Sequence, residues 1–229
     1  ERWGSFVWTK ENKAKADWHI AKYPDGRAKS AVMPLLDLAQ RQVGEETDTQ
    51  GWLPLPVIEY VAAYIDVPVI RVLEVATFYF MYNMKPVGKY HVQVCGTTPC
   101  MLRGSEELIK VCKSRIHEQP FHLNEEGTLS WEEVECQGAC VNAPMVMIFK
   151  DTYEDLTAER LEEIIDAFEA GKGDDVTPGP QIERIFSAPA GGLTTLNGEV
   201  VGKPKKAAPN AKNATMKIAE TASKAGETA

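Results

Sequence analysis

The apolar positions of the chain follow a helical spacing in its first third and an alternating spacing from residue 89 onward. Between residues 30 and 83, apolar side chains recur every three or four positions in three successive stretches. This spacing gathers them on one face of a helix. Pro34 and Pro68 fall at predicted helix starts, where the missing N–H costs little, and Gly44 provides a C-terminal stop. We therefore predict a three-helix bundle at about 30–83.

One further helix is predicted ahead of this bundle. Thr9 is a suitable N-cap for a helix that runs to about Lys22 and ends before Pro24. Few residues contribute to its apolar side: Ala14, Trp18 and Ala21. Such a helix requires a surface to pack on, either the chain's own bundle or a partner. At the end of the bundle, four aromatic residues are predicted to pack in the core: Phe78, Tyr79, Phe80 and Tyr82.

Beyond residue 89 the pattern predicts strands interleaved with helices. The predicted order is a strand over 89–95, a helix from about 103 to 115, strands over 129–135, 145–149 and near 153, and a helix over 157–171. One parallel crossover followed by a hairpin, with helices packed on a mixed sheet, is the thioredoxin-like arrangement. The predicted fold class is therefore α/β, with an N-terminal helical bundle followed by a thioredoxin-like domain with a mixed sheet.

These patterns divide the chain into four predicted parts: a helical region over 1–86, a thioredoxin-like domain over 87–172, an extended arm over 173–202 and a basic tail over 203–229. The tail holds six Lys and two Glu, a net charge of +4, and since the whole chain carries −8, residues 1–202 carry −12. The tail has no apolar period, so we expect it to be disordered. The acidic balance of the chain argues against nucleic acid as a partner.

Membrane insertion and secretion are not expected. The longest apolar run, Val75–Tyr82, is far shorter than the roughly 18 residues of a membrane span. No charged-then-apolar signal peptide opens the sequence. The five cysteines are therefore expected in a reducing compartment, where clustered Cys residues bind metal or carry out redox chemistry.

Four of these cysteines form two closely spaced pairs, each at a predicted strand end. Cys95 and Cys100 follow a C-x4-C spacing, and Cys136 and Cys140 follow a C-x3-C spacing after an intervening 35 residues. A strand end can present thiolates to a metal from an adaptable backbone. The fifth, Cys112, lies on the apolar face of a predicted helix, and we expect it to be a small buried residue rather than a ligand.

Several chemistries are compatible with two thiolate pairs. Disulfides are disfavoured by the compartment, and a thioredoxin-type dithiol would need a C-x-x-C motif, which the sequence lacks. A Rieske centre would need two His ligands, and only His91 lies near a candidate cysteine. A [2Fe–2S] cluster fits best because each iron takes two thiolates, while a zinc site comes second and structural cysteines third. Two alternatives stay open for His91: a hydrogen bond that tunes the cluster, or an edge-facing polar residue.

Two further stretches, together with the cysteine pattern, resemble a known family. The stretches are Ser30-Ala31-Val32-Met33-Pro34-Leu35-Leu36 and Glu74-Val75-Ala76-Thr77-Phe78-Tyr79. From about Ala14 to Leu196 the chain closely resembles the E-subunit family of NADH–quinone oxidoreductase, the thioredoxin-like [2Fe–2S] proteins of respiratory complex I. The resemblance implies a thioredoxin-like [2Fe–2S] ferredoxin domain that holds one cluster through four ligands: Cys95, Cys100, Cys136 and Cys140.

The resemblance also implies a setting for the cluster. FMN is expected on a partner, the NADH-binding flavoprotein subunit, with which this chain would exchange single electrons without being catalytic alone. Other peripheral-arm subunits of complex I are the further implied partners. The implied location is the cytoplasmic face of a bacterial inner membrane, or the matrix side in mitochondria, without direct membrane insertion. Rival functions are the equivalent subunit of an NAD-dependent hydrogenase or formate dehydrogenase, a mobile ferredoxin, and a zinc-stabilised interaction module.

The sequence also predicts surfaces for partner proteins and the isomer of one peptide bond. We expect the bundle and the Trp-rich start of the chain to contact a partner. The segment from Pro178 to Leu196 is expected either to lie on a partner or to be a flexible tail. Thioredoxins place a cis-proline just before the third strand, so the resemblance implies a cis Ala143–Pro144 bond.

Overall fold

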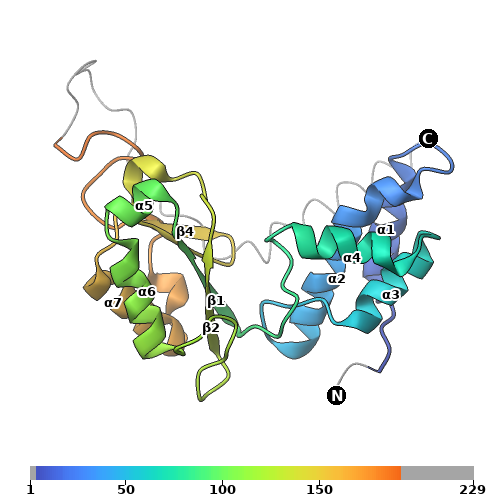
Figure 1. The fold of residues 1–229 in the computed structure, drawn as a ribbon, viewed down its shortest axis with the longest axis horizontal. Helices are drawn as coiled ribbons and strands as arrows, with labels where there is room; N and C mark the ends of the chain where they lie inside the picture. Colours follow the sequence, from blue (N-terminus) through green and yellow to red (C-terminus); the bar gives the residue numbers. More distant parts are fainter. Residues whose placement is uncertain (1–3, 192–229) are drawn as a thin grey trace.

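The computed structural model describes residues 4–191, which form a group of helices beside a sheet that carries helices of its own (Figure 1). The helical group contains α1 (Lys10–Ala21), η1 (Ala28–Ala31), α2 (Val32–Thr47), α3 (Leu55–Tyr64) and α4 (Val69–Phe78). Its core is built by the apolar faces of α2, α3 and α4, with Phe6 and Trp8 packed against them from ahead of α1. The predicted helical N-terminal region is confirmed.

Helix α1 packs on α2 through small and polar side chains. Thr9 caps the helix as predicted, its hydroxyl accepting from the backbone N–H of Asn12 at 3.2 Å. Asn12 and Ala16 are buried, and Asn12 Nδ2 donates to Gln42 Oε1 of α2 at 3.1 Å. Trp18, which the sequence pattern placed on the apolar side, is 59% exposed, so it does not anchor the helix.

The aromatic residues at the end of α4 do not all enter the core. Tyr82 is buried, and its hydroxyl donates to the carbonyl of Met33 at 2.9 Å. Phe78, Tyr79 and Phe80 are 74%, 39% and 65% exposed, so the prediction that they pack in the core is wrong. Phe78, the last residue of α4, lies off the helix face that buries Val72 and Ala76. Tyr79 is extended, so helical spacing no longer sets the direction of the Phe80 side chain.

Five strands form a mixed sheet in the order β2-β1-β3-β4-β5. The strands are β1 (Tyr90–Cys95), β2 (Leu129–Val134), β3 (Val146–Ile148), β4 (Asp151–Glu154) and β5 (Gly179–Pro180). β1 is parallel to β2 and antiparallel to β3, β3 is antiparallel to β4, and β4 is parallel to β5. The mixed sheet and the predicted order of its first four strands along the chain are confirmed.

Helices pack on one face of this sheet (Figure 1). The helical segments of this half are α5 (Thr98–Leu102), α6 (Ser105–Arg115), η2 (Cys140–Asn142), α7 (Ala158–Glu169) and η3 (Gly173–Asp175). Apolar residues of α6 and α7 pack in one core with Val92 and Val94 of β1. Because side chains alternate along a strand, His91, Gln93 and Cys95 face the other side of the sheet.

Residues after α2 join the helical group to the sheet. The backbone N–H of His91 donates to Gln50 Oε1, and the backbone N–H of Gln50 donates to the carbonyl of Gly88, each at 3.0 Å. Lys89 Nζ lies 2.8 Å from a carboxylate oxygen of Asp48. The two halves are thus held by backbone contacts as well as by the chain connection, and the domain limits at 86 and 172 stay a prediction.

The part of the predicted arm that the structure describes is residues 173–191, and within it β5 and Gln181 pair with the chain's own sheet. β5 pairs with β4 in the register Tyr153 to Gly179. The rest of the arm and the basic tail, residues 192–229, lie outside the described part. The Ala143–Pro144 peptide bond is cis, as predicted. No helix within residues 4–191 has both the length and the apolar character needed to cross a bilayer.

Candidate metal centre

The four paired cysteines lie at one edge of the sheet, where the parallel strands β1 and β2 end. Cys95 is the last residue of β1, and Cys136 follows β2 by two positions. Cys95 is paired with Val134 in the parallel register, so both segments leave the sheet side by side. Cys100 then lies in α5, and Cys140 opens η2. The topology therefore brings together two cysteine pairs that 35 residues separate in the sequence.

Within this group the thiols are close enough to form hydrogen bonds. Cys136 Sγ lies 3.3 Å from Cys140 Sγ. Hydrogen bonds of Cys95 with Cys100 and with Cys136 contribute to the pKa shifts of those two thiols. Cys95 and Cys100 are buried beside Met145, whereas Cys136 and Cys140 are exposed. One pair therefore faces the protein interior and the other faces the surface.

The thiols shift one another's ionisation in opposite directions. The backbone N–H of Gly138, which donates to Cys136 Sγ at 3.4 Å, lowers the pKa of Cys136, and the Cys140 thiol lowers it further. The hydrogen bond to Cys136 in turn raises the pKa of Cys140. Burial, followed by the hydrogen bond with Cys95, raises the pKa of Cys100 to about 12. Adjacent thiolates repel one another, so full ionisation of the group requires a nearby positive charge, which a metal supplies.

This donor set fits a two-iron cluster. Thiolates are the usual ligands of iron–sulfur clusters, and a [2Fe–2S] cluster takes two of them for each iron. Contacts link the sulfurs in the order Cys100, Cys95, Cys136 and Cys140, so all four lie close enough together to bind one cofactor.

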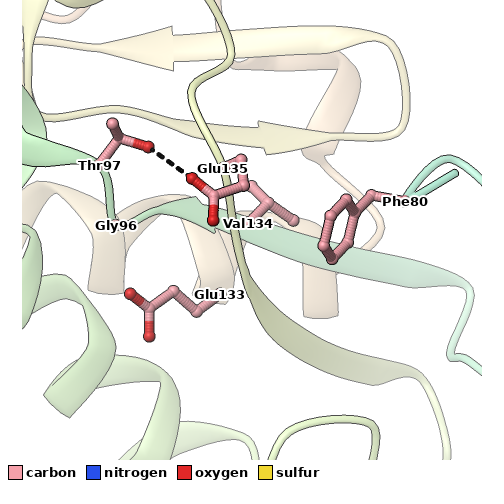
Figure 2. A pocket seen from close by; sticks show the side chains of 6 residues that line it. All are labelled: Phe80, Gly96, Thr97, Glu133, Val134 and Glu135. Atoms are coloured by element: carbon pink, nitrogen blue, oxygen red, sulfur yellow. Dashed lines mark hydrogen bonds between the residues drawn. The ribbon is translucent and has the colours of Figure 1, made fainter. Parts of the chain in front are cut away.

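A shallow pocket lies beside the cysteine group (Figure 2). Three segments line it: Phe80 after α4, Gly96 and Thr97 after β1, and Glu133, Val134 and Glu135 around the end of β2. Thr97 Oγ1 donates to Glu135 Oε2 at 3.3 Å, which links the loop after Cys95 to the loop before Cys136. A Cβ at position 96 would lie 1.9 Å from Glu133 Oε1, so glycine allows this carboxylate to approach the loop.

Phe80 was not identified from the sequence as a neighbour of the cysteine loops. The pattern placed it in the helical core, and no motif connects it with residues 96 or 135. The one signal in the sequence is its position directly after the stretch Glu74–Tyr79, which carries the family resemblance. Its exposed ring extends the surface beside the cysteines with residues of the helical half.

Two other candidate residues have roles outside the cysteine group. Cys112 is buried on α6, as predicted, and burial raises its pKa to about 12. His91 is fully buried, with its ring nitrogens 2.7 Å from Ser130 Oγ and 3.2 Å from Glu132 Oε1. Both ring nitrogens are therefore engaged within the sheet, and both alternatives for His91, a hydrogen bond to the cluster and an edge-facing residue, are wrong.

Comparison with known proteins gives matches over most of the chain. The family model of the thioredoxin-like [2Fe-2S] ferredoxin matches residues 16–169. An E subunit of NADH-quinone oxidoreductase from Rhizobium meliloti is 63% identical over 203 residues, which are 88% of this chain and 71% of that protein. The E subunit of NADH-quinone oxidoreductase from Rickettsia bellii is 52% identical over 162 residues, 71% of this chain and 93% of that protein. Among solved structures, an NAD+-reducing [NiFe]-hydrogenase in the H2-reduced state has a TM-score of 0.51 at 19% identity, over 63% of this chain and 23% of that one, a likeness of fold alone.

Proposed function

From the premise that this chain belongs to the NADH-quinone oxidoreductase E-subunit family of thioredoxin-like [2Fe–2S] ferredoxins, we propose that it is an electron-transfer subunit of that enzyme. In this role it holds one [2Fe–2S] cluster and is not catalytic alone. The cluster exchanges single electrons with the FMN of a partner, the NADH-binding flavoprotein subunit. The observation that carries the proposal is the convergence of two thiol pairs at the ends of neighbouring parallel strands.

The four ligands in this proposal are the converging cysteines. Cys95 and Cys100 hold the cluster from the buried side, and Cys136 and Cys140 hold it from the exposed side. When bound, the cluster supplies reversible one-electron redox chemistry at a group that carries net negative charge. The backbone N–H of Gly138, already directed at Cys136 Sγ, supports this charge through a hydrogen bond to sulfur.

The surface around the exposed pair supports docking on another protein. Val141 of η2 and Leu102 of α5, the two short helices that contain Cys140 and Cys100, are 67% and 74% exposed. Phe80 adds an exposed aromatic side chain from the helical half at the pocket beside the same loops. Exposed apolar and aromatic side chains that gather near a redox centre favour a protein partner over solvent. In the Trp-rich start, Trp8 is buried in the chain's own core, whereas Trp18 is 59% exposed and is available to a partner.

The rival functions are less well supported. The likeness to the NAD+-reducing hydrogenase is one of fold at 19% identity, whereas identity to an E subunit of NADH-quinone oxidoreductase reaches 63%. A mobile ferredoxin would not require the helical half with its exposed aromatic residues. A zinc module would use the same four thiolates, and the matching family model, that of a thioredoxin-like [2Fe-2S] ferredoxin, favours the cluster over it.

The proposed location is the cytoplasmic face of the bacterial inner membrane, as a peripheral subunit. Bacterial relatives support this choice over a mitochondrial matrix. The other proposed partners are the remaining peripheral-arm subunits of the enzyme, since the chain offers both a helical surface and the surface around the cysteine loops.

The ligand assignment is tested by metal analysis of single-cysteine variants of the full chain. We expect about two irons and about two labile sulfides per chain in the wild type, with an EPR signal on reduction by dithionite. Changing Cys95, Cys100, Cys136 or Cys140 to Ser removes or rearranges this signal. Cys112→Ala is the matched control and keeps it, because Cys112 lies in the helix core. One zinc per chain without labile sulfide would refute the cluster.

The partner assignment is tested by size-exclusion chromatography of native membrane extract. We expect the chain to elute with a flavin-containing protein in a large complex. Elution as a small monomer that retains its cluster would favour the mobile ferredoxin.

A further inference from the structure

The segment that follows β5 lies against the loop that carries Cys140. The backbone N–H of Gln181 donates to the carbonyl of Glu154 at 2.9 Å, which continues the pairing of β5 with β4. A few residues later, the carbonyl of Phe186 accepts from Asn142 Nδ2 at 3.0 Å. Residues 181–188 thus cross the end of the sheet at η2, the short helix that Cys140 opens.

Arg184 is the side chain through which this segment holds the loop. Its Nη1 donates to the carbonyl of Val141 at 3.1 Å and to Asn142 Oδ1 at 2.5 Å. Its Nη2 lies 3.3 Å from Asp155 Oδ1, and the Arg184 and Asp155 side chains are only 10% and 6% exposed. A guanidinium buried in this way, with donors directed at a backbone carbonyl, an amide and a carboxylate, is fixed in position more firmly than a surface ion pair.

Asn142 connects these groups with the cysteine loop. It is 2% exposed and lies two positions after Cys140. The backbone carbonyl of Asn142 accepts from the backbone N–H of Asp155 at 2.7 Å. Its side-chain Nδ2 donates to Glu154 Oε2 at 2.6 Å as well as to the backbone carbonyl of Phe186. Without Arg184, Asn142 Oδ1 would lose its charged donor, and the Asp155 carboxylate would stay buried without its cation.

The loop itself has mainly short-range contacts. Gly138 has a φ of +87°, and its backbone N–H donates to Cys136 Sγ, two positions earlier in the chain. The N–H of Asn142 donates to the carbonyl of Ala139 at 2.9 Å. Before Cys140 the loop meets distant residues through the Cys136 thiol, near Cys95, and through Ala139, which packs against the buried cysteines. The hydrogen bonds from Arg184 to this loop lie on the C-terminal side of Cys140, at Val141 and Asn142.

We propose that residues 181–188 form a clasp on the Cys140 loop and that Arg184 is a positioning residue for the cluster. The proposal rests on the proposed role of Cys140 as a ligand. Arg184 does not touch the cluster; it fixes the backbone that presents Cys140 Sγ. Cluster retention and the electronic environment of the cluster then depend on a residue 44 positions after the ligand that it places.

The position of Asp155 connects the clasp to the other cysteine pair. Burial raises the pKa of Asp155, while the positive charges of Arg184 and of Arg103 oppose this rise. Arg103 is the C-cap of α5, the helix that contains Cys100. The carboxylate thus lies under the influence of one arginine from the clasp and one from the Cys100 segment.

The test uses the full chain loaded with its cluster and three arginine variants. In R184Q we expect the cluster to be lost to a chelator about tenfold faster than in the wild type, with an altered visible CD spectrum. R184K also loses it faster, because one ammonium does not span the contacts that the guanidinium makes with Val141, Asn142 and Asp155. Arg115→Gln is the control: Arg115 is a half-exposed arginine paired with Asp166, and this variant behaves as the wild type.

Two further variants keep the outcome decisive. If R184Q does not fold, as judged by far-UV CD, N142S removes the other side of the same contact and is expected to lose the cluster at the same raised rate. Wild-type retention and visible CD in folded R184Q or N142S, or full rescue by R184K, would overturn the clasp. C140S is measured alongside. If C140S keeps an unaltered cluster, the assignment of Cys140 as a ligand is wrong. If C140S loses the cluster while R184Q behaves as the wild type, only the clasp is refuted.

Discussion

Replacing Glu132 by Ala is expected to destabilise the sheet strongly, although the residue lies outside the cysteine group. Glu132 is 4% exposed on β2. Its Oε1 accepts from Gln93 Nε2 at 2.8 Å and lies 3.2 Å from His91 Nε2. Both nitrogens belong to β1, so the carboxylate joins the parallel strands β1 and β2 on the face away from α6 and α7. In E132A, both nitrogens remain buried without this partner.

The magnitude follows from the number of groups left unpaired. A buried polar group without a partner costs about 1–3 kcal/mol, so two of them cost about 2–6 kcal/mol. This is a large share of the roughly 5–15 kcal/mol that stabilises a folded protein. With a urea dependence of about 2 kcal/mol per M, the unfolding midpoint falls by roughly 1–3 M.

The assay is urea unfolding of the loaded chain under anaerobic conditions, followed by far-UV CD. Glu133→Ala is the matched control, because Glu133 lies on the same strand with its side chain exposed. A surface change of this kind usually alters stability by less than about 0.5 kcal/mol. If E132A and E133A unfold at the same urea concentration, the buried network contributes nothing measurable and the reasoning is refuted.

Two further predictions concern single positions. Gly51 has a φ of +89° and a Cβ there would lie 2.1 Å from the carbonyl oxygen of Gln40, whereas Gly26 has a φ of +74° in open space. The free energy of unfolding is therefore expected to fall by about 2–5 kcal/mol in G51A and by about 1–2 kcal/mol in G26A. If thermal melting shows the same loss of stability in both variants, the close approach at Gly51 has no effect. Burial raises the pKa of Cys112 to about 12, so its reactive thiolate stays scarce from pH 7 to 9. Iodoacetamide should modify Cys112 only after unfolding, and mass spectrometry that finds it alkylated in the native loaded chain at pH 9 would show that the thiol is accessible.

Much of the fold is encoded in local patterns. Helical spacing identifies α2, α3 and α4 because each buries one face in a shared core. Alternation identifies β1, whose Val92 and Val94 face the helices. The cysteine pairs could be located because they follow β1 and β2 directly, and neighbouring parallel strands end at one edge.

The features that sequence analysis missed are contacts between distant segments. β5 is a two-residue strand of Gly and Pro, which offers neither alternation nor apolar side chains. Arg184 meets Asn142 across 42 positions, and no periodic pattern connects them. The pairing of His91 with Glu132 depends on strand register, which places His91 opposite Ser130 and two positions from Glu132, on the same face of the sheet. Phe80 shows the limit of helical spacing, since it lies beyond the last helical residue of α4.

The place of the clasp near the end of the described chain has a consequence for biogenesis. A protein emerges from the ribosome from its N-terminus, and its parts begin to fold in that order. All four proposed ligands precede residue 141, whereas Arg184 is synthesised later. We therefore expect all four thiolates of a nascent chain to be available to metal before Arg184 closes over the loop, so that metal binding does not have to wait for the fixing of the Cys140 backbone.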